Sequence, residues 1–257
     1  MNTRHKFDVN CLQILIGLNV LIFFLLPKSG FWWQVALSSY GIKSLKLWQL
    51  VSYQFLHGSL THLCFNMWGL YLFGRYVLKQ MGTQRFLTLY FLSGISGALL
   101  WLLFNWNSRV PVIGASGAVF GVMMAAALYF PEMRIMLLIP PIPLKLRTFV
   151  LIYAAIEIFS EFSAMQSGIA HLAHLGGFLA AYLYIRLSSG ESLGAVLKHP
   201  LAAFNRPTHQ SLSYRPTTGT PSEINRKTFE IIMSEIEKLE HENSQATDVM
   251  DQEDKQA

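Results

Sequence analysis

The stretch Gly114-Ala115-Ser116-Gly117-Ala118-Val119-Phe120-Gly121 opens an apolar segment that extends from residue 112 to residue 130. A helix of about 20 apolar residues can cross a bilayer, so this segment is a candidate membrane span. Small residues let neighbouring helices approach closely, and serine is common at such contacts. Ser116 is therefore either a packing residue or a nucleophile, and the second interpretation requires a base at a similar depth in another span.

The composition around this stretch is that of a membrane protein. The chain has 257 residues, of which 52% are hydrophobic and only 14% are charged, whereas about 25% of the residues of a soluble domain are charged. The apolar residues lie in runs separated by short charged loops, a pattern typical of polytopic membrane proteins. From about residue 188 the chain becomes polar. We expect one membrane domain followed by a polar tail.

Six apolar segments are predicted to cross the membrane as α-helices, which makes the expected fold class an all-α polytopic membrane protein. Residues 28–56 combine several Trp and Tyr residues with three lysines, and they predict an interfacial first loop with short amphipathic helices. Residues 135–147 are apolar but contain three prolines, and they predict a loop against the membrane surface. The predicted spans are 11–26, 60–77, 86–104, 112–130, 147–162 and 168–187.

The basic residues predict the orientation of these spans. Six spans place both termini on one side of the membrane, and that side would carry eleven of the basic residues near the spans against four on the other side. Positive residues gather in cytoplasmic loops, so both termini are expected in the cytoplasm. The eleven are Arg4, Lys6, Arg75, Lys79, Arg85, Arg134, Lys145, Arg147, Arg186, Lys198 and Arg206, and the four are Lys28, Lys43, Lys46 and Arg109.

The predicted domain boundaries follow from these spans. Residues 1–10 form a cytoplasmic N-terminus, and residues 11–187 form the membrane domain. The apolar run after residue 10 has no small-residue cleavage site behind it, so we expect a retained helix. Residues 188–222 are rich in Ser, Thr and Pro and predict a flexible linker. Residues 223–257 form a cytoplasmic tail with a short amphipathic helix, whose partner the sequence does not identify.

Charge and cysteine content limit the partners and cofactors that we expect. The net charge of +5 reflects the placement of basic loops and does not indicate a nucleic-acid partner. Cys11 and Cys64 both lie in apolar surroundings, and their spacing is not that of a metal site. We therefore expect the lipid bilayer as surroundings, no nucleic acid, no cofactor and no metal.

Polar groups inside the spans are the candidate functional residues, because burying them in a membrane is costly. The second, fourth and sixth predicted spans all start on the outer side. Counted from the outer ends at 1.5 Å per residue, Ser116 lies about 6 Å deep and His174 about 9 Å deep. The candidates are His57, at the edge of the second span, and His62, Asn66, Ser116, Glu157, His171 and His174 within the spans.

Ser116 and His174 can form a nucleophile and its general base. A serine hydroxyl needs a base to take its proton and donors to hold the oxyanion that forms. His62 and Asn66 are four residues apart on one helix face, and both can donate hydrogen bonds. Together with the backbone N–H of Ser116 they predict an oxyanion hole. No Asp in the spans is placed to complete a triad, so we expect a Ser-His dyad.

The remaining polar residues have simpler interpretations. His171 lies one turn before His174 on the same face and is the rival base. His57, at the junction of the first loop and the second span, is expected to fix the loop. Glu157 faces no cationic partner that the sequence identifies, so packing or loop anchoring is expected, with a functional role as the weaker alternative. The small residues expected to bring the fourth and sixth spans together are Gly117, Gly121, Gly177 and Ala181.

Taken in order, these motifs resemble those of the rhomboid intramembrane serine proteases, over about residues 10–187. The nucleophile motif GxSG is matched at residues 114–117, and the family's pair of histidines with an asparagine is matched in HGSLTHLCFN. The sequence also resembles the family in the third predicted span, from Phe86 to Gly97, and in an IPLK stretch at 142–145. The AHxxGxxxG motif is matched at Ala173, His174 and Gly177, with Ala181 in place of the last glycine.

The resemblance implies a six-helix rhomboid core, with a water-filled active site that opens to the outer side and a single-pass membrane substrate that enters laterally. It implies Ser116 and His174 as the catalytic residues, with His62, Asn66 and the Ser116 N–H at the oxyanion. Gly114 belongs to the nucleophile motif.

Besides Ala181, three positions depart from the family pattern. The aromatic residue that packs on the catalytic histidine, usually Tyr, is here Phe120. Gln49 and Lys79 replace an arginine and an acidic residue that are common in the family.

The predicted function is that of an intramembrane serine endopeptidase that cleaves single-pass transmembrane proteins near the outer membrane face. A non-catalytic rhomboid-like binder of transmembrane helices is the alternative. A small transporter with His62 and His174 as a proton relay fits less well, because the inner halves of the fourth and sixth predicted spans are apolar apart from occasional Tyr. A bacterial inner membrane is the expected location.

Overall fold

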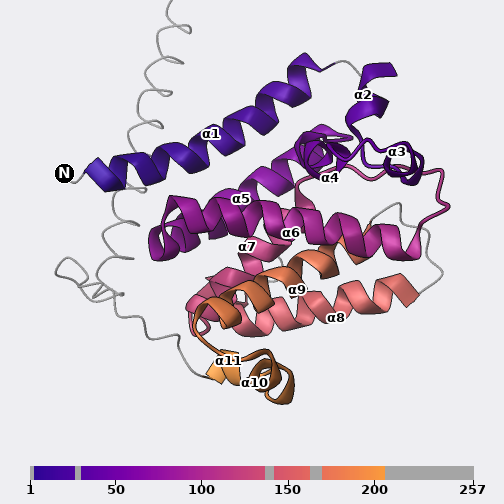
Figure 1. Cartoon of the computed structure of the whole chain (residues 1–257). Helices are drawn as coiled ribbons and strands as arrows, with labels where there is room; N and C mark the ends of the chain where they lie inside the picture. Colours follow the sequence, from indigo (N-terminus) through magenta and orange to yellow (C-terminus); the bar gives the residue numbers. More distant parts are fainter. Residues whose placement is uncertain (1–2, 27–29, 137–141, 163–169, 206–257) are drawn as a thin grey trace, which may run out of the picture. The chain divides into compact units, whose positions relative to one another are not determined.

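The computed structural model describes residues 3–26, 30–136, 142–162 and 170–205, and these residues are mostly helical (Figure 1). Each of the six segments predicted as a span contains a long helix. The first helix begins earlier than predicted, and the second ends later. The six helices are α1 (Thr3–Leu25), α5 (Leu60–Met81), α6 (Thr83–Phe104), α7 (Ser116–Tyr129), α8 (Leu146–Phe162) and α9 (His171–Ser188).

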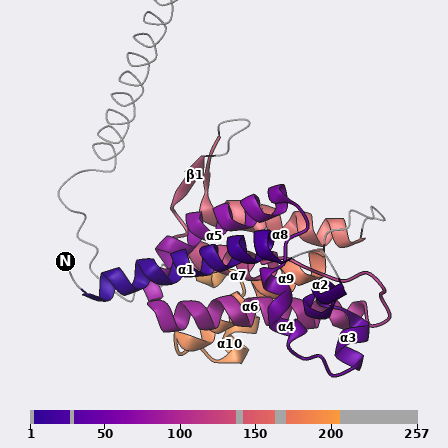
Figure 2. The ribbon, with the colours of Figure 1, turned by 90° about the horizontal axis from the view of Figure 1, so that it is seen from above.

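The helix α7 lies at the centre of the packing. It contacts α5, α6, α8 and α9, and Figures 1 and 2 both show it among these helices. Its sequence is built largely from Gly, Ala, Val and Met, and most of its residues are buried. Small side chains bring the surrounding helices close to it. The stretch from Gly114 to Gly121 therefore contains the start of the central helix of the molecule.

Backbone contacts between glycines and carbonyls set how closely α9 packs on α6 and α7. A Cβ atom on Gly177 would lie 1.9 Å from the carbonyl oxygen of Gly117 in α7. A Cβ on Gly97 in α6 would lie 2.4 Å from the carbonyl oxygen of Ala173. Both distances are shorter than any tolerable contact, so these positions require glycine for the observed packing.

The helix α7 begins at Ser116, four residues later than the predicted span. Val112 instead pairs with Leu37 in an isolated antiparallel bridge, with N···O distances of 2.8 and 3.1 Å. The N–H of Gly114 donates to the carbonyl of Tyr53 at 2.9 Å. The prediction that Ser116 lies one turn inside the helix was wrong, because contacts with the first loop hold residues 112–115 outside it.

The first loop contains short helices, as expected for an interfacial segment. They are α2 (Gly30–Val35), α3 (Ser39–Lys43), α4 (Gln49–Ser52) and the 3₁₀ helix η1 (Tyr53–Phe55). Gln49 ties the loop together, because its Oε1 accepts from the N–H of Ser38 and its Nε2 donates to the carbonyl of Gln34, each at 3.0 Å. A buried neutral amide thus crosslinks the loop at the position where the resemblance led us to expect arginine.

The segment predicted as a proline-broken loop contains a short hairpin. Strand β1 (Arg134–Met136) pairs antiparallel with β2 (Pro143–Lys145), and residues 137–141 lie outside the described residues. Glu132, just before β1, contacts Lys145 at 2.7 Å and Arg147 at 3.0 Å. These exposed ion pairs lower the pKa of Glu132 and join the end of α7 to the start of α8.

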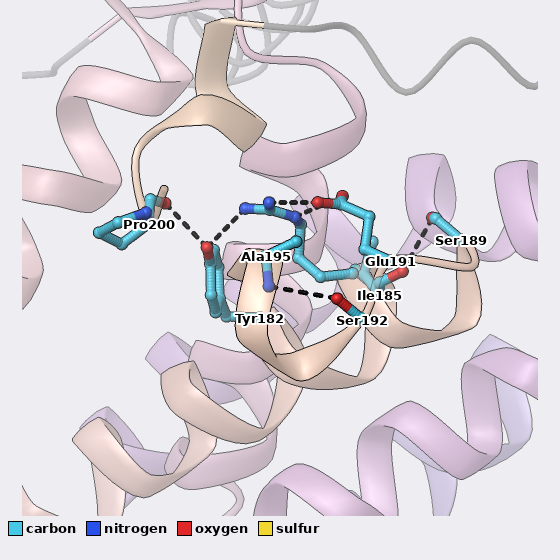
Figure 3. A network of polar contacts seen from close by, with 8 residues as sticks. Tyr182, Ile185, Ser189, Glu191, Ser192, Ala195 and Pro200 are labelled. Atoms are coloured by element: carbon cyan, nitrogen blue, oxygen red, sulfur yellow. Dashed lines mark hydrogen bonds and ion pairs between the residues drawn. The ribbon is translucent and has the colours of Figure 1, made fainter. Parts of the chain in front are cut away.

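Part of the predicted linker is helical. Helix α10 (Leu193–Lys198) contacts α9, and α11 (Ala202–Asn205) contacts α7. Arg186 near the end of α9 is buried, binds both carboxylate oxygens of Glu191 and donates to the Tyr182 hydroxyl at 2.6 Å. Tyr182 in turn donates to the carbonyl of Pro200 at 2.8 Å (Figure 3). The rest of the linker and the predicted tail helix lie outside the described residues.

Within the part of the chain that the structure describes, only α6 is both long and apolar enough to count as a membrane span by itself. Two further apolar helical stretches, Cys11–Leu25 and Ser116–Tyr129, fall short in length. The helical fold is therefore established, whereas the count of six spans stays a prediction.

Candidate active site

Ser116 and His174 lie in direct contact. The Nε2 atom of His174 is 2.8 Å from the Oγ of Ser116, and the two residues are 58 positions apart in the sequence. Ser116 is the first residue of α7, and His174 lies in the first turn of α9. The glycine contacts between these helices bring the two side chains together. At this distance the serine O–H can donate to Nε2, as a nucleophile does to its base.

Phe120 fixes the plane of the His174 ring. The two rings are stacked with centroids 4.2 Å apart and an interplanar angle of 6°. Phe120 lies one turn after Ser116 on α7, and its ring also meets Phe178 edge-on at 5.0 Å. This contact matches the one that the family resemblance predicts for the residue at this position. The phenyl ring leaves the imidazole free to move only within its own plane.

Glu157 contacts both histidines at the start of α9. One carboxylate oxygen, Oε2, lies 3.0 Å from Nδ1 of His174 and 2.6 Å from Nδ1 of His171. Glu157 is only 6% exposed, and it comes from α8. The sequence identified no partner for Glu157, but the face of α8 that carries it turns toward α9 and two histidines there. His171, the rival base, reaches Glu157 through its Nδ1.

These three side chains are of the types that bind metal ions, so their spacing was compared with that of a coordination sphere. The candidate ligand atoms of Glu157, His171 and His174 lie within 4.8 Å of one another. Ligands at 2.0–2.1 Å from a tetrahedral zinc lie about 3.3 Å apart. The distances of 2.6 and 3.0 Å from Oε2 are shorter and are those of hydrogen bonds. The spacing of these three side chains therefore fits hydrogen bonds better than the coordination of a metal ion.

Gly114 lies directly against the imidazole of His62 and close to Ser116. Its φ of +120° is accessible mainly to glycine. A Cβ atom at this position would lie 2.7 Å from Nε2 of His62 and 3.8 Å from Oγ of Ser116. The nucleophile motif therefore needs glycine at its first position, for the backbone conformation and because His62 lies too close for a Cβ atom.

His62 and Asn66 lie on α5 as the four-residue spacing predicts. The side-chain amide of Asn66 donates to the carbonyl of His62 at 2.9 Å, one turn earlier. One of its two amide protons is thus used within its own helix, and no direct hydrogen bond joins Asn66 to Ser116 among the described residues. His62 and Ser116 both lie next to Gly114, whereas Asn66 lies one turn further along α5.

His57 lies before α5 and supports His62. Its ring is 2% exposed and meets the His62 ring edge-on, with centroids 5.0 Å apart. Burial, with a smaller contribution from His62, lowers the pKa of His57 to about 4. The ring is therefore neutral at pH 7 and packs against the imidazole that borders the serine.

Glu157 is the one member of this cluster whose contact with His174 the sequence analysis missed. A signal was present, because a carboxylate in an apolar helix is costly unless it has partners. The only histidines in the following helix that could serve, His171 and His174, are both within its first turn. The direction of the Glu157 side chain depends on the rotation of α8 about its own axis, and the sequence alone does not predict that rotation.

Comparison with known proteins assigns the family. The Rhomboid domain matches residues 44–190, which include every residue of this cluster. The chain is 32% identical to the mitochondrial Rhomboid protein 1 of Saccharomyces cerevisiae over 183 residues, covering 68% of this chain and 52% of that protein. It is 29% identical to the rhomboid protease GluP of Bacillus subtilis over 197 residues, covering 74% of this chain and 37% of that protein.

A further relative is described as inactive in its name. The chain is 38% identical over 80 residues to the inactive RHOMBOID-like protein 8 of Arabidopsis thaliana, covering 31% of this chain and 22% of that protein. The chain thus spans about half or less of the length of these relatives. Because the domain matches more than half of the chain and includes the Ser116–His174 pair, the chain belongs to the rhomboid family of integral membrane proteins.

Proposed function

We propose that this protein is an intramembrane serine endopeptidase that uses Ser116 as nucleophile and His174 as general base. One observation carries the proposal: Oγ of Ser116 lies 2.8 Å from Nε2 of His174, in a chain of the rhomboid family. A serine that only served helix packing would not need an imidazole within hydrogen-bond distance. GluP, which carries the name of a rhomboid protease, supports the same activity for this chain.

The reaction begins with a proton transfer. As Oγ of Ser116 attacks the substrate carbonyl carbon, the hydroxyl proton moves to Nε2 of His174. The tetrahedral intermediate collapses, the C–N bond breaks, and the leaving amine takes the proton from Nε2. An ester between Ser116 and the substrate remains. Water then attacks this ester with His174 again as base, which releases the acid product and restores the hydroxyl.

The oxyanion of the intermediate is stabilised beside Gly114. The backbone N–H of Ser116 lies at the start of α7 and lacks an intrahelical partner. Nε2 of His62 lies against Gly114, the residue whose Cβ position is 3.8 Å from Oγ of Ser116, and we propose that its Nε2–H donates to the oxyanion. Asn66 contributes its second amide proton after a change of side-chain rotamer. These are the roles that the family resemblance predicts for the two residues.

The substrate is a single-pass membrane protein, cleaved near the outer membrane face. In this proposal α1 and α5–α9 are the six spans, and α5, α7 and α9 all start on the outer side. A helical substrate must unwind locally before its carbonyl can reach Ser116, because its backbone groups are otherwise hydrogen-bonded. Substrates with helix-breaking or small residues near the outer face are therefore preferred.

Substitution of the nucleophile tests this proposal. The Ser116→Ala variant removes the only atom that attacks the carbonyl, so cleavage of a co-expressed single-pass substrate should fall to the background rate. A fluorophosphonate probe, which reacts with activated serines, should label the wild type and not the variant. Ser108→Ala is the matched control, because the Ser108 hydroxyl bonds only Val110, among the described residues, in the loop before α7, and it should cleave and bind probe as the wild type does.

The same experiment separates the two candidate functions. A non-catalytic binder of transmembrane helices, as the inactive Arabidopsis relative would suggest, predicts no probe labelling of the wild type. Cleavage that persists in Ser116→Ala would reject Ser116 as the nucleophile.

A further inference from the structure

Glu157 takes no part in the dyad mechanism described above, yet it lies against the base. Its Oε2 is 3.0 Å from Nδ1 of His174, on the opposite side of the ring from Ser116. The side chain is buried, and it reaches His174 from α8 while Ser116 reaches it from α7. The imidazole is thus held between a hydroxyl and a carboxylate.

The protonation state of a working base explains why an acceptor at Nδ1 matters. To accept the serine proton, Nε2 of neutral His174 must carry a lone pair, so the ring proton must be on Nδ1. An Nδ1–H needs an acceptor when it is buried. Oε2 of Glu157 lies at the right distance to accept it. The carboxylate therefore selects the tautomer in which Nε2 faces Ser116 as an acceptor.

We propose that Glu157 is a positioning residue for His174, so that this protein works with a Ser-His-Glu arrangement and not with an unassisted dyad. The inference rests on the proposed protease function. During proton transfer, the proton of Ser116 moves to Nε2 while the Nδ1 proton stays hydrogen-bonded to Glu157. The negative charge stabilises the imidazolium that forms, and the carboxylate itself remains unprotonated.

Among the described groups around His174, Glu157 is the source of the negative charge that stabilises the imidazolium. The groups that face the ring are Ser116 from α7, Phe120 from α7, His62 from α5, and His171 and Glu157. Among these described groups only the carboxylate can be negative. Coulomb interactions are strong where water is excluded. Neutralising Glu157 should therefore change both the rate and its dependence on pH.

His171 has a separate part in this arrangement. Its Nδ1 lies 2.6 Å from the same Oε2, so the carboxylate can accept one N–H from each histidine. Two donors hold the carboxylate group in place and compensate for its burial. The carboxylate is then aimed at His174 before a substrate arrives, and His171 acts through Glu157 without touching the serine.

The test compares Glu157→Gln with wild type in detergent micelles, and Glu161→Gln is the matched control. Glu161 lies one turn later on α8 and is exposed, so its substitution repeats the chemical change away from the site. We expect Glu157→Gln to lower kcat by about 100-fold or more with KM within a few-fold, since an Asp→Asn change in a serine protease triad costs about 10⁴. Glu161→Gln should match the wild type.

The pH profile distinguishes positioning from a structural role. Loss of the neighbouring charge should move the acidic limb of the kcat/KM profile to lower pH, because His174 then loses its proton more readily. Glu157→Asp keeps the charge, so it should keep the wild-type acidic limb and regain at least tenfold of the lost rate. Melting temperatures of all variants show which of them are folded.

Two results would overturn the inference. One is a Glu157→Gln enzyme with kcat within threefold of wild type. The other is a loss of rate with an unmoved acidic limb, which would assign Glu157 a purely structural role. Ser116→Ala and fluorophosphonate labelling run alongside. If wild type neither cleaves nor binds probe, the proposed function has failed, whereas an active wild type with an unaffected Glu157→Gln rejects only the Ser-His-Glu arrangement.

Discussion

At the scale of single residues, His174 is held from three sides by three different interactions. Ser116 contacts Nε2, Glu157 contacts Nδ1, and Phe120 stacks on the ring face. The hydrogen bonds fix the direction of the ring within its plane, and the stack fixes the plane. Phe in place of the family's usual tyrosine keeps the stack and lacks only the hydroxyl. The orientation of the base therefore does not depend on a hydroxyl at this position.

His57 should make the stability of the fold depend on pH. Its pKa is lowered from 6.5 to about 4 in the folded protein, so between these values the unfolded chain binds the proton and the folded chain does not. Stability is then complete above about pH 6.5, falls as the pH drops toward 4, and levels off below, with a total loss of roughly 3 kcal/mol.

Thermal melting at pH 7.5 and at pH 4.5 checks this prediction. The decrease in melting temperature between the two should be smaller in His57→Gln than in wild type, by about 5 °C or more. The exposed His199 provides the control, and His199→Gln should melt as the wild type does at both values. Equal decreases in wild type and His57→Gln would contradict the prediction.

At the scale of elements, the approach of α7 and α9 determines whether Ser116 and His174 can meet. The Gly177→Ala variant places a methyl group 1.9 Å from the carbonyl oxygen of Gly117, and backbone cannot yield as a flexible side chain can. The helices must separate, which should lower the melting temperature. A displacement of about 1 Å at a catalytic pair can cost up to 100-fold in rate. Fluorophosphonate labelling should accordingly slow by at least about tenfold.

Gly17→Ala is the control for this substitution. Gly17 lies in α1, and a Cβ there would meet nothing within 4 Å. Its replacement should leave labelling unchanged and, if anything, stabilise the helix. A Gly177→Ala protein that is labelled at the wild-type rate would show that the two helices need not pack this closely.

Much at this scale was predictable from the sequence, and the exceptions share a cause. Apolar runs bounded by Gly, Pro and charged residues predict where long helices lie, and the matching depths of Ser116 and His174 in their spans predict that these two meet. The start of α7 was misplaced because Val112 pairs with Leu37, which is far away in sequence. The partner of Glu157 was missed because the rotation of α8 depends on packing. Local patterns carry neither kind of long-range information.

At the scale of the whole molecule, the open question is how many of the long helices cross the membrane. The helix α6 qualifies by itself, whereas α7 is short and α9 carries two histidines. Because α7 lies at the centre of the packing, it is surrounded by other helices and not by lipid. It therefore does not need a long apolar surface. Membership of the rhomboid family and the placement of basic residues favour six spans with both termini in the cytoplasm.

Cysteine labelling of intact cells tests this topology. In a protein with Cys11 and Cys64 replaced by alanine, a single cysteine is introduced at Arg109, in the loop between α6 and α7, or at Gln84, in the first turn of α6. Both positions are exposed, so access to each depends only on the side of the membrane. With six spans and cytoplasmic termini, a membrane-impermeant maleimide should label Arg109→Cys from outside and Gln84→Cys only after the cells are opened.

Two other labelling patterns would contradict this topology. Since α6 separates the two positions, labelling of both from outside would show that α6 does not cross the membrane. The reverse pattern would place the termini outside, and it would move the Ser116–His174 pair, which lies at the same end of the helices as Arg109, to the cytoplasmic face.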